Sequence, residues 1–227
     1  MKKEKSQPKV GGLPFYLSIL ALLMLVPVAL LAMPAVLGSA NVSRIFRFVV
    51  GTFAGFFVGL VFIRGRFSVF LHELRHSVVS SLAGNRAKAF KYKNQTGSFE
   101  YQYSSATAHF NALIALAPYF LPIFTVAALG VGLAIFLHRP ENLVLLIGVG
   151  YGIDLIINLR DAGPHQSDLT ELIGGYPIGM LFIVLINTAI FCLLFAWVCQ
   201  GVAGLQIILA AFWTIGLQIQ NSAGGMP

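Results

Sequence analysis

The sequence contains little charge and almost no cysteine. Only 10% of its 227 residues are charged, whereas soluble domains carry about 25%. Because 57% of the residues are hydrophobic, this scarcity of charge excludes an ordinary soluble domain and predicts an integral membrane protein. Cys192 and Cys199, the only cysteines, share one apolar segment about 10 Å apart along a helix, too far for a disulfide between them. We expect both to be packing residues.

Acidic residues are scarcer than basic ones. Eight Asp and Glu against fifteen Lys and Arg give a formal charge of +7. The basic residues lie mostly outside the apolar runs, which fits contact with anionic lipid headgroups and a positive-inside bias. No basic stripe is interleaved with aromatic residues, so we expect a lipid bilayer as partner and no nucleic acid.

Seven apolar segments alternate with polar interruptions. All but the third approach or exceed the length that spans a hydrocarbon core. The first, with about 25 residues, is too long for a signal peptide and is expected to be retained as a transmembrane helix. We therefore expect an all-α polytopic membrane protein of about six transmembrane helices, forming one domain over residues 1–227. The segments are 13–37, 45–63, 67–83, 108–137, 143–159, 176–199 and 202–219.

The polar stretch after the third segment does not look helical. Residues 87–93 and 98–103 alternate polar and apolar side chains and are rich in β-formers, with a turn at 94–97 between them. This pattern predicts a membrane-associated β-hairpin over 87–103. Its exposed edge can pair with an extended substrate peptide, with Phe99 and Tyr101 as the substrate-binding residues. A surface hairpin without such a role is the alternative.

The basic residues also indicate a topology. If residues 45–83 cross the membrane once, the N-terminus, the hairpin and the loop around Arg160 share one side. That side gathers roughly nine of the fifteen basic residues, and we assign it to the cytoplasm.

The third segment contains His72-Glu73-Leu74-Arg75-His76, an HExxH motif. On a helix, two histidines four residues apart lie about 40° from each other around the axis and roughly 6 Å apart. Both imidazoles can then hold one zinc ion, with Glu73 beside them as the general base that deprotonates a water. Ionisable residues in an apolar helix are costly and usually functional. The alternative is a polar helix turn at the membrane surface.

A catalytic zinc site needs a third protein ligand and an open position. Asp168 is the first choice, because it begins a predicted helix that Ser167 can cap, and His165 is second. Asp154, inside an apolar run, is expected to pair with Arg75 or Arg160 or to orient a ligand. Asn158 and His165 are further candidates for that orienting role. The ligand candidates considered are His109, His138, His165, Asp154, Asp161 and Asp168.

The segment 66–79 around the motif resembles the core helix of the site-2 protease family of intramembrane zinc metallopeptidases. It is similar to the small bacterial branch without a PDZ domain. In that family a Gly and a membrane-associated hairpin follow the motif helix, as Gly84 and residues 87–103 do here. A later Asp at the start of a helix supplies the third ligand, and residues 167–172 resemble that element. The likeness covers residues 66–177, about half the chain.

Two features depart from the family. Arg75 stands where its members usually carry Gly, and the NxxPxxxxDG pattern is absent apart from Asn158 and Asp168. The resemblance implies a multi-pass protein of a bacterial cytoplasmic membrane that binds Zn²⁺ through His72, His76 and Asp168. It would hydrolyse a peptide bond in or near the transmembrane segment of a membrane-protein substrate. The alternative is a non-catalytic metal-binding transporter or scaffold.

Overall fold

The computed structural model describes residues 9–92 and 97–224, which are mostly helical with one two-stranded antiparallel sheet. The predicted helical fold with a small hairpin is thereby confirmed. The elements are α1 (Leu13–Gly38), α2 (Val42–Phe62), α3 (Arg66–Leu82), β1 (Arg86–Tyr92), β2 (Gly97–Gln102), η1 (Ala108–Phe110), α4 (Asn111–Leu116), η2 (Ala117–Tyr119), α5 (Ile123–Phe136), α6 (Pro140–Asp161), α7 (Ser167–Thr170), α8 (Gly175–Gln200) and α9 (Val202–Gly224).

Fewer helices are long enough to cross a membrane than the apolar runs suggest. Among the described residues, α1, α2, α6 and α8 meet the length and composition of a span. The pair Ala108–Tyr119 and Ile123–Phe136, bent by 73°, makes a fifth if it counts as one span. Helix α3 has only 17 residues, and the apolar part of α9, Val202–Gln218, is also short. The expected number of about six is therefore four or five by these criteria.

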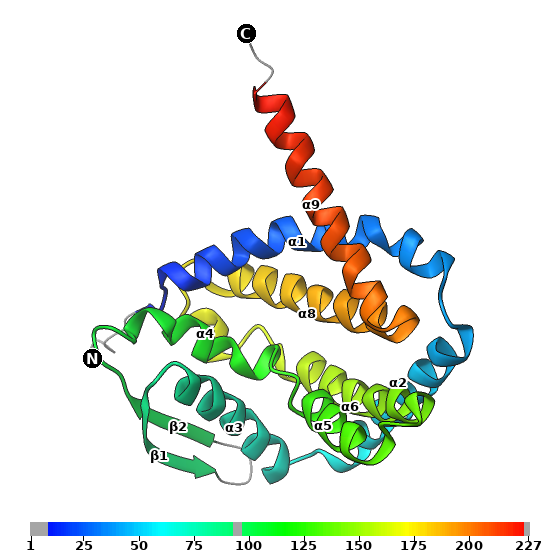
Figure 1. The fold of residues 1–227 in the computed structure, drawn as a ribbon. Helices are drawn as coiled ribbons and strands as arrows, with labels where there is room; N and C mark the ends of the chain where they lie inside the picture. The colour runs from blue at the N-terminus through cyan, green and yellow to red at the C-terminus, as the bar shows by residue number, and fades with distance from the viewer. Residues whose placement is uncertain (1–8, 93–96, 225–227) are drawn as a thin grey trace, which may run out of the picture.

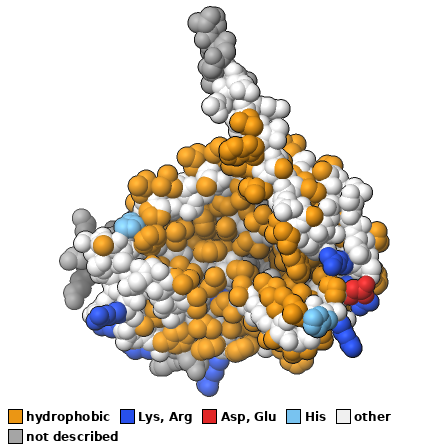
Figure 2. All heavy atoms as spheres, viewed as in Figure 1, with side chains coloured by type: hydrophobic (Ala, Val, Ile, Leu, Met, Phe, Trp, Pro, Cys, Tyr) orange, Lys and Arg blue, Asp and Glu red, His pale blue; other side chains and the backbone are white. Residues whose placement is uncertain are grey.

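The helices form two groups beside each other (Figure 1). Helices α1 and α8 lie side by side, while α2, α5 and α6 pack together, and α9 projects away from the body. Gly152 of α6 lies so close to the Thr52 carbonyl of α2 that a Cβ would not fit. Hydrophobic side chains cover much of the face in Figure 2, with charged ones toward its margins. This distribution supports association with a lipid bilayer.

The predicted apolar run 108–137 is broken where two prolines occur. Helix α4 ends at Leu116 and η2 at Tyr119, and α5 begins after Pro122, which stands at its N-cap. Proline has no N–H to continue a helical ladder, so the chain turns there. The break lies against α3 and α6, because Arg75 and Asp154 both bond to residues beside it.

The hairpin follows α3 directly and packs on it through aromatic rings. Its strands pair antiparallel with Phe90 opposite Phe99, and the ring of Phe90 lies 5.7 Å from that of Phe70 on α3. The strands run from Arg86 to Gln102, within one residue of the predicted range. Of the predicted turn, residues 94–96 lie outside the described part of the chain.

The N-terminal segment reaches the same region. Val10 forms a parallel bridge with Leu172, in which its N–H donates to the Glu171 carbonyl at 2.8 Å and its carbonyl accepts from Ile173 at 2.8 Å. The N-terminal segment therefore lies against the stretch that follows Arg160. The assignment of this side to the cytoplasm stays a prediction. Lys2, Lys3 and Lys5 lie outside the described residues.

Candidate metal centre

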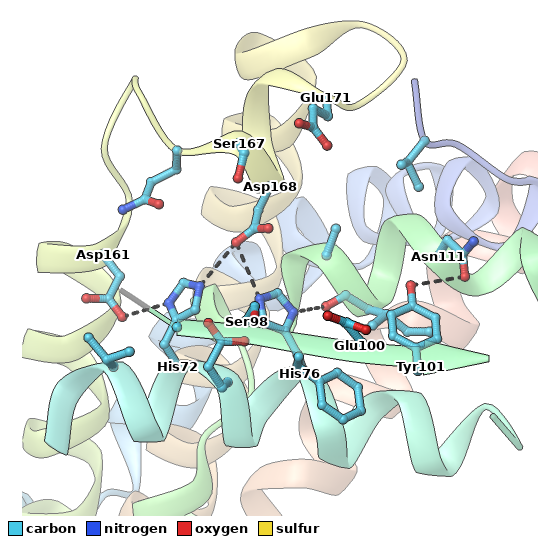
Figure 3. A pocket seen from close by; sticks show the side chains of 18 of the residues that line it. His72, His76, Ser98, Glu100, Tyr101, Asn111, Asp161, Ser167, Asp168 and Glu171 are labelled. Atoms are coloured by element: carbon cyan, nitrogen blue, oxygen red, sulfur yellow. Dashed lines mark hydrogen bonds and ion pairs between the residues drawn. The ribbon is translucent and has the colours of Figure 1, made fainter. Parts of the chain in front are cut away.

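Helix α3 presents the two motif histidines on one face. His72 and His76 are one turn apart, with ring centroids separated by 5.0 Å. Figure 3 shows both imidazoles pointing toward Asp168, which lies across the cavity on α7. The helical spacing alone produces this pairing of rings, because residues four apart share a face.

Asp168 lies within reach of both rings. Its Oδ2 atom is 3.1 Å from Nε2 of His72 and 3.4 Å from Nε2 of His76. One ligand atom from each of the three residues falls within 4.8 Å of the others, as a metal site requires. Fully buried Leu169 and Leu172 anchor this stretch in the core.

The local start of this helix differs from the prediction. Helix α7 begins at Ser167, and Gln166 occupies its N-cap without a side-chain hydrogen bond. The idea that Ser167 caps a helix beginning at Asp168 is therefore wrong. Asp168 is held instead by buried neighbours and by its contacts with the histidines.

Each histidine is oriented through its second nitrogen. Nδ1 of His72 lies 3.3 Å from Oδ2 of Asp161, and Nδ1 of His76 lies 2.7 Å from the carbonyl oxygen of Ile114. A carbonyl only accepts hydrogen bonds, so Nδ1 of His76 carries a proton, and loss of the proton on Nε2 would leave that nitrogen's lone pair for a metal. Carboxylates and backbone carbonyls are the usual partners behind metal-bound imidazoles. Both Nε2 atoms are thus directed at one point.

The electrostatics of this cluster favour a cation at that point. Burial alone lowers the pKa of His72, but hydrogen bonds to Asp161 and Asp168 outweigh it and raise that pKa to about 9. Burial alone would raise the pKa of Asp168, yet the hydrogen bonds from His72 and His76 hold it below its usual range. The Asp168 carboxylate therefore stays ionised and attracts positive charge.

Glu73 lies beside the histidines and beneath the hairpin. It is only 7% exposed, and burial raises the pKa of its carboxyl group. The backbone N–H of Phe99 hydrogen-bonds this carboxylate, so the unpaired edge of β2 faces Glu73. A Cβ on Gly97 would lie 2.5 Å from Oε1 of Glu73, and only glycine leaves that space.

These groups line a cavity of about 950 Å³ between α3, β2, α4 and α7. Five of the eight acidic residues of this chain of charge +7 line it, so the cavity suits a cation and disfavours an anionic ligand. These acidic residues are Glu73, Glu100, Asp161, Asp168 and Glu171.

The remaining predicted residues lie in three places. Phe99 and Tyr101 line the cavity, and the Tyr101 hydroxyl donates to Asn111 at 3.2 Å. Asp154 pairs with Arg75 at 2.7 Å, and Asn158 accepts from the same guanidinium at 2.7 Å. His165 is exposed. The predicted pairing of Asp154 with Arg75 is thus confirmed. The carboxylate that contacts a motif histidine from behind is that of Asp161, because Asp154 and Asn158 are directed at Arg75.

The sequence alone does not indicate two of these contacts. They are the contact of Asp161 with His72 and that of Tyr119, whose hydroxyl donates to Asp168 at 3.2 Å. Asp161 ends an apolar helix, which marks it as unusual, but its partner is 89 residues away in sequence. No local pattern specifies such a contact.

The donor set fits zinc. Two imidazole nitrogens and one carboxylate oxygen form a known catalytic zinc set that leaves a coordination position open.

Comparisons with protein-family models, with curated proteins and with solved structures found no match to this chain. The resemblance to the site-2 protease family therefore stays a prediction from the motif residues.

Proposed function

We propose that this protein is an intramembrane zinc metalloendopeptidase that cleaves a membrane-protein substrate in or near its transmembrane segment. One observation carries the proposal: His72, His76 and Asp168 converge in a cavity that also holds Glu73, within a chain whose helices are long and apolar enough to span a membrane. A structural metal site has no need of a buried carboxylate beside its ligands or of an adjoining cavity.

His72, His76 and Asp168 would hold the zinc ion. When bound, zinc supplies Lewis-acid activation of a water molecule and of the carbonyl under attack. Asp161 and the Ile114 carbonyl keep the two imidazoles in the orientation that offers Nε2.

Glu73 is the base in this proposal. Its raised pKa brings the carboxylate nearer to the range in which a group both takes and returns a proton. It accepts the proton of the attacking water and then gives it to the leaving amine. Hydrogen bonding to the Phe99 N–H holds the carboxylate beside the cavity.

Strand β2 supplies the place for substrate. A substrate helix hides its peptide groups in its own hydrogen bonds and must unwind before it is cleaved. The unpaired edge of β2, with Phe99 and Tyr101, can pair with the unwound segment and replace those bonds. Because this edge and Glu73 line the same cavity, a substrate segment paired with β2 would be cleaved beside Glu73.

The test compares wild-type protein with Glu73→Gln in proteoliposomes that contain a panel of single-span membrane proteins. New peptide termini are identified by mass spectrometry. We expect termini only with the wild type, with equal zinc content in both proteins. Equal zinc flux across the vesicle membrane by both, without new termini, would instead establish the transporter.

A further inference from the structure

Tyr119 contacts two of the three proposed zinc ligands. Its hydroxyl donates to Oδ2 of Asp168 at 3.2 Å, and its ring stands at 86° to that of His72 with centroids 5.8 Å apart. Tyr119 is 0% exposed, so this hydroxyl faces Asp168 rather than solvent. The contact joins the helix break to the metal centre.

We propose that Tyr119 is a positioning residue that holds the Asp168 carboxylate toward the two histidines, and that Arg75 keeps Tyr119 in place through the helix break. This inference rests on the proposed zinc site. A carboxylate can rotate about its side-chain bonds, and a hydrogen-bond donor behind it removes that freedom. Such partners of ligands typically contribute about ten- to a hundredfold to metal affinity.

The break leaves two backbone carbonyls without their helical donors. In a continuous helix the Pro118 carbonyl would accept from residue 122, but Pro122 has no N–H. Arg75 takes over as donor, with its Nη1 atom 2.5 Å from that oxygen. The Tyr119 carbonyl likewise accepts from the Asn187 amide on α8 at 2.9 Å, while Ile123 N–H bonds to Leu121.

Arg75 is itself fixed from α6. Its guanidinium is 0% exposed and donates to Asp154 at 2.7 Å and to Asn158 at 2.7 Å. Asp154 also accepts from the Thr125 N–H at 2.7 Å, on the far side of the break. A buried ion pair is costly to desolvate and is a weak source of net stability. This pair bonds to both sides of the break, Arg75 to Pro118 and Asp154 to Thr125, and such a position fits a role in orienting Tyr119.

The first experiment measures zinc affinity of full-length protein in detergent by competition with a chelator. Tyr119→Phe removes only the hydroxyl. We expect it to weaken zinc binding about ten- to a hundredfold while the circular dichroism spectrum stays unchanged. Tyr151→Phe is the matched control. Tyr151 lies on α6 and packs against Phe48 of α2 and Phe191 of α8, away from the proposed ligands. That variant should bind zinc as the wild type does.

A double-mutant cycle tests the route of the effect. In an Asp168→Ala background, the additional loss from Tyr119→Phe should fall below about twofold, since its partner is gone. Arg75→Lys keeps the positive charge, but the ammonium group cannot reproduce the hydrogen bonds that the guanidinium donates to Pro118, Asn158 and Asp154. Zinc affinity should therefore also fall in this variant. If Arg75→Lys fails to fold, zinc affinity is measured in Asn187→Leu instead, because the Asn187 amide on α8 donates to the Tyr119 carbonyl at the same break. Its zinc affinity should fall as well.

The outcomes separate the two proposals. Absence of zinc binding by the wild type would refute the proposed function itself. Wild-type binding with equal affinity in Tyr119→Phe and Tyr151→Phe would overturn only the role of Tyr119. An undiminished effect of Tyr119→Phe in the Asp168→Ala background would also overturn it, because the hydroxyl would then act on something other than Asp168.

Discussion

The carboxylate of Asp161, the last residue of α6, lies 3.3 Å from Nδ1 of His72 on α3. The bond leaves Nε2 of the same ring facing Asp168 at 3.1 Å. Asp161 therefore sets the orientation of the His72 ring, and Asp168 contacts the other nitrogen of that ring. In the proposed zinc site Asp161 would orient the imidazole and Asp168 would bind the metal, a division that is typical of metal centres.

Asp161→Asn should weaken zinc binding about tenfold, because the amide keeps the shape of the side chain but loses the charge that supports the imidazole. Glu171→Gln is the matched control: it removes one negative charge from the same cavity, whose lining includes both residues. Zinc affinity is measured by chelator competition. Equal losses in the two variants would mean that only the overall cavity charge matters.

His72→Ala and His76→Ala should each abolish stoichiometric zinc. The wild type should carry about one zinc per chain, since three protein ligands and one open position make one site. Metal content of purified protein by atomic absorption checks this. His109→Ala is the control, because His109 is not one of the three residues of the site. Unchanged metal content in both motif variants would contradict the assignment.

Asp168→Ala should weaken zinc binding far more than His165→Ala. Asp168 lies within 3.4 Å of both Nε2 atoms, whereas His165 is exposed in the loop before α7. A lost ligand and a lost surface side chain differ by orders of magnitude in metal affinity. Titration of both chelator-treated variants with zinc measures the difference. A larger effect of His165→Ala would reverse the choice of third ligand.

Gly97→Ala should lower turnover about ten- to a hundredfold while zinc stays bound. The added Cβ would meet Oε1 of Glu73 at 2.5 Å and Cγ1 of Val69 at 2.6 Å, so the base must move. A displacement of about 1 Å at a catalytic group can cost about a hundredfold. Gly130→Ala, on a helix with open space around it, is the control. Turnover is measured on a membrane substrate that the wild type cleaves.

Tyr101→Pro should impair cleavage more than Tyr101→Ala. Tyr101 is two residues from Phe99, so its N–H points to the same free edge of β2, and only proline removes that donor. One lost hydrogen bond of about 1 kcal/mol corresponds to about fivefold in the specificity constant. Zinc content should be equal in both variants. Equal cleavage by the two would show that the ring contributes but strand pairing does not.

The sequence by itself determined the local geometry. A spacing of four residues places His72 and His76 on one helical face whatever surrounds them. The alternation over 87–103 specified a hairpin, and the long apolar runs specified helices suited to a bilayer. These features depend on neighbours in the chain, so pattern and propensity suffice for them.

Tertiary structure decided which distant groups meet those histidines. Asp161, Asp168 and the Ile114 carbonyl come from elements 89, 96 and 38 residues away from their partners. Their approach depends on how α3, α4, α6 and α7 pack, which local periodicity does not encode. The same holds for the break at Pro122. Its proline is visible in the sequence, but Arg75 as the donor to the freed carbonyl follows only from the packing of α3 against it.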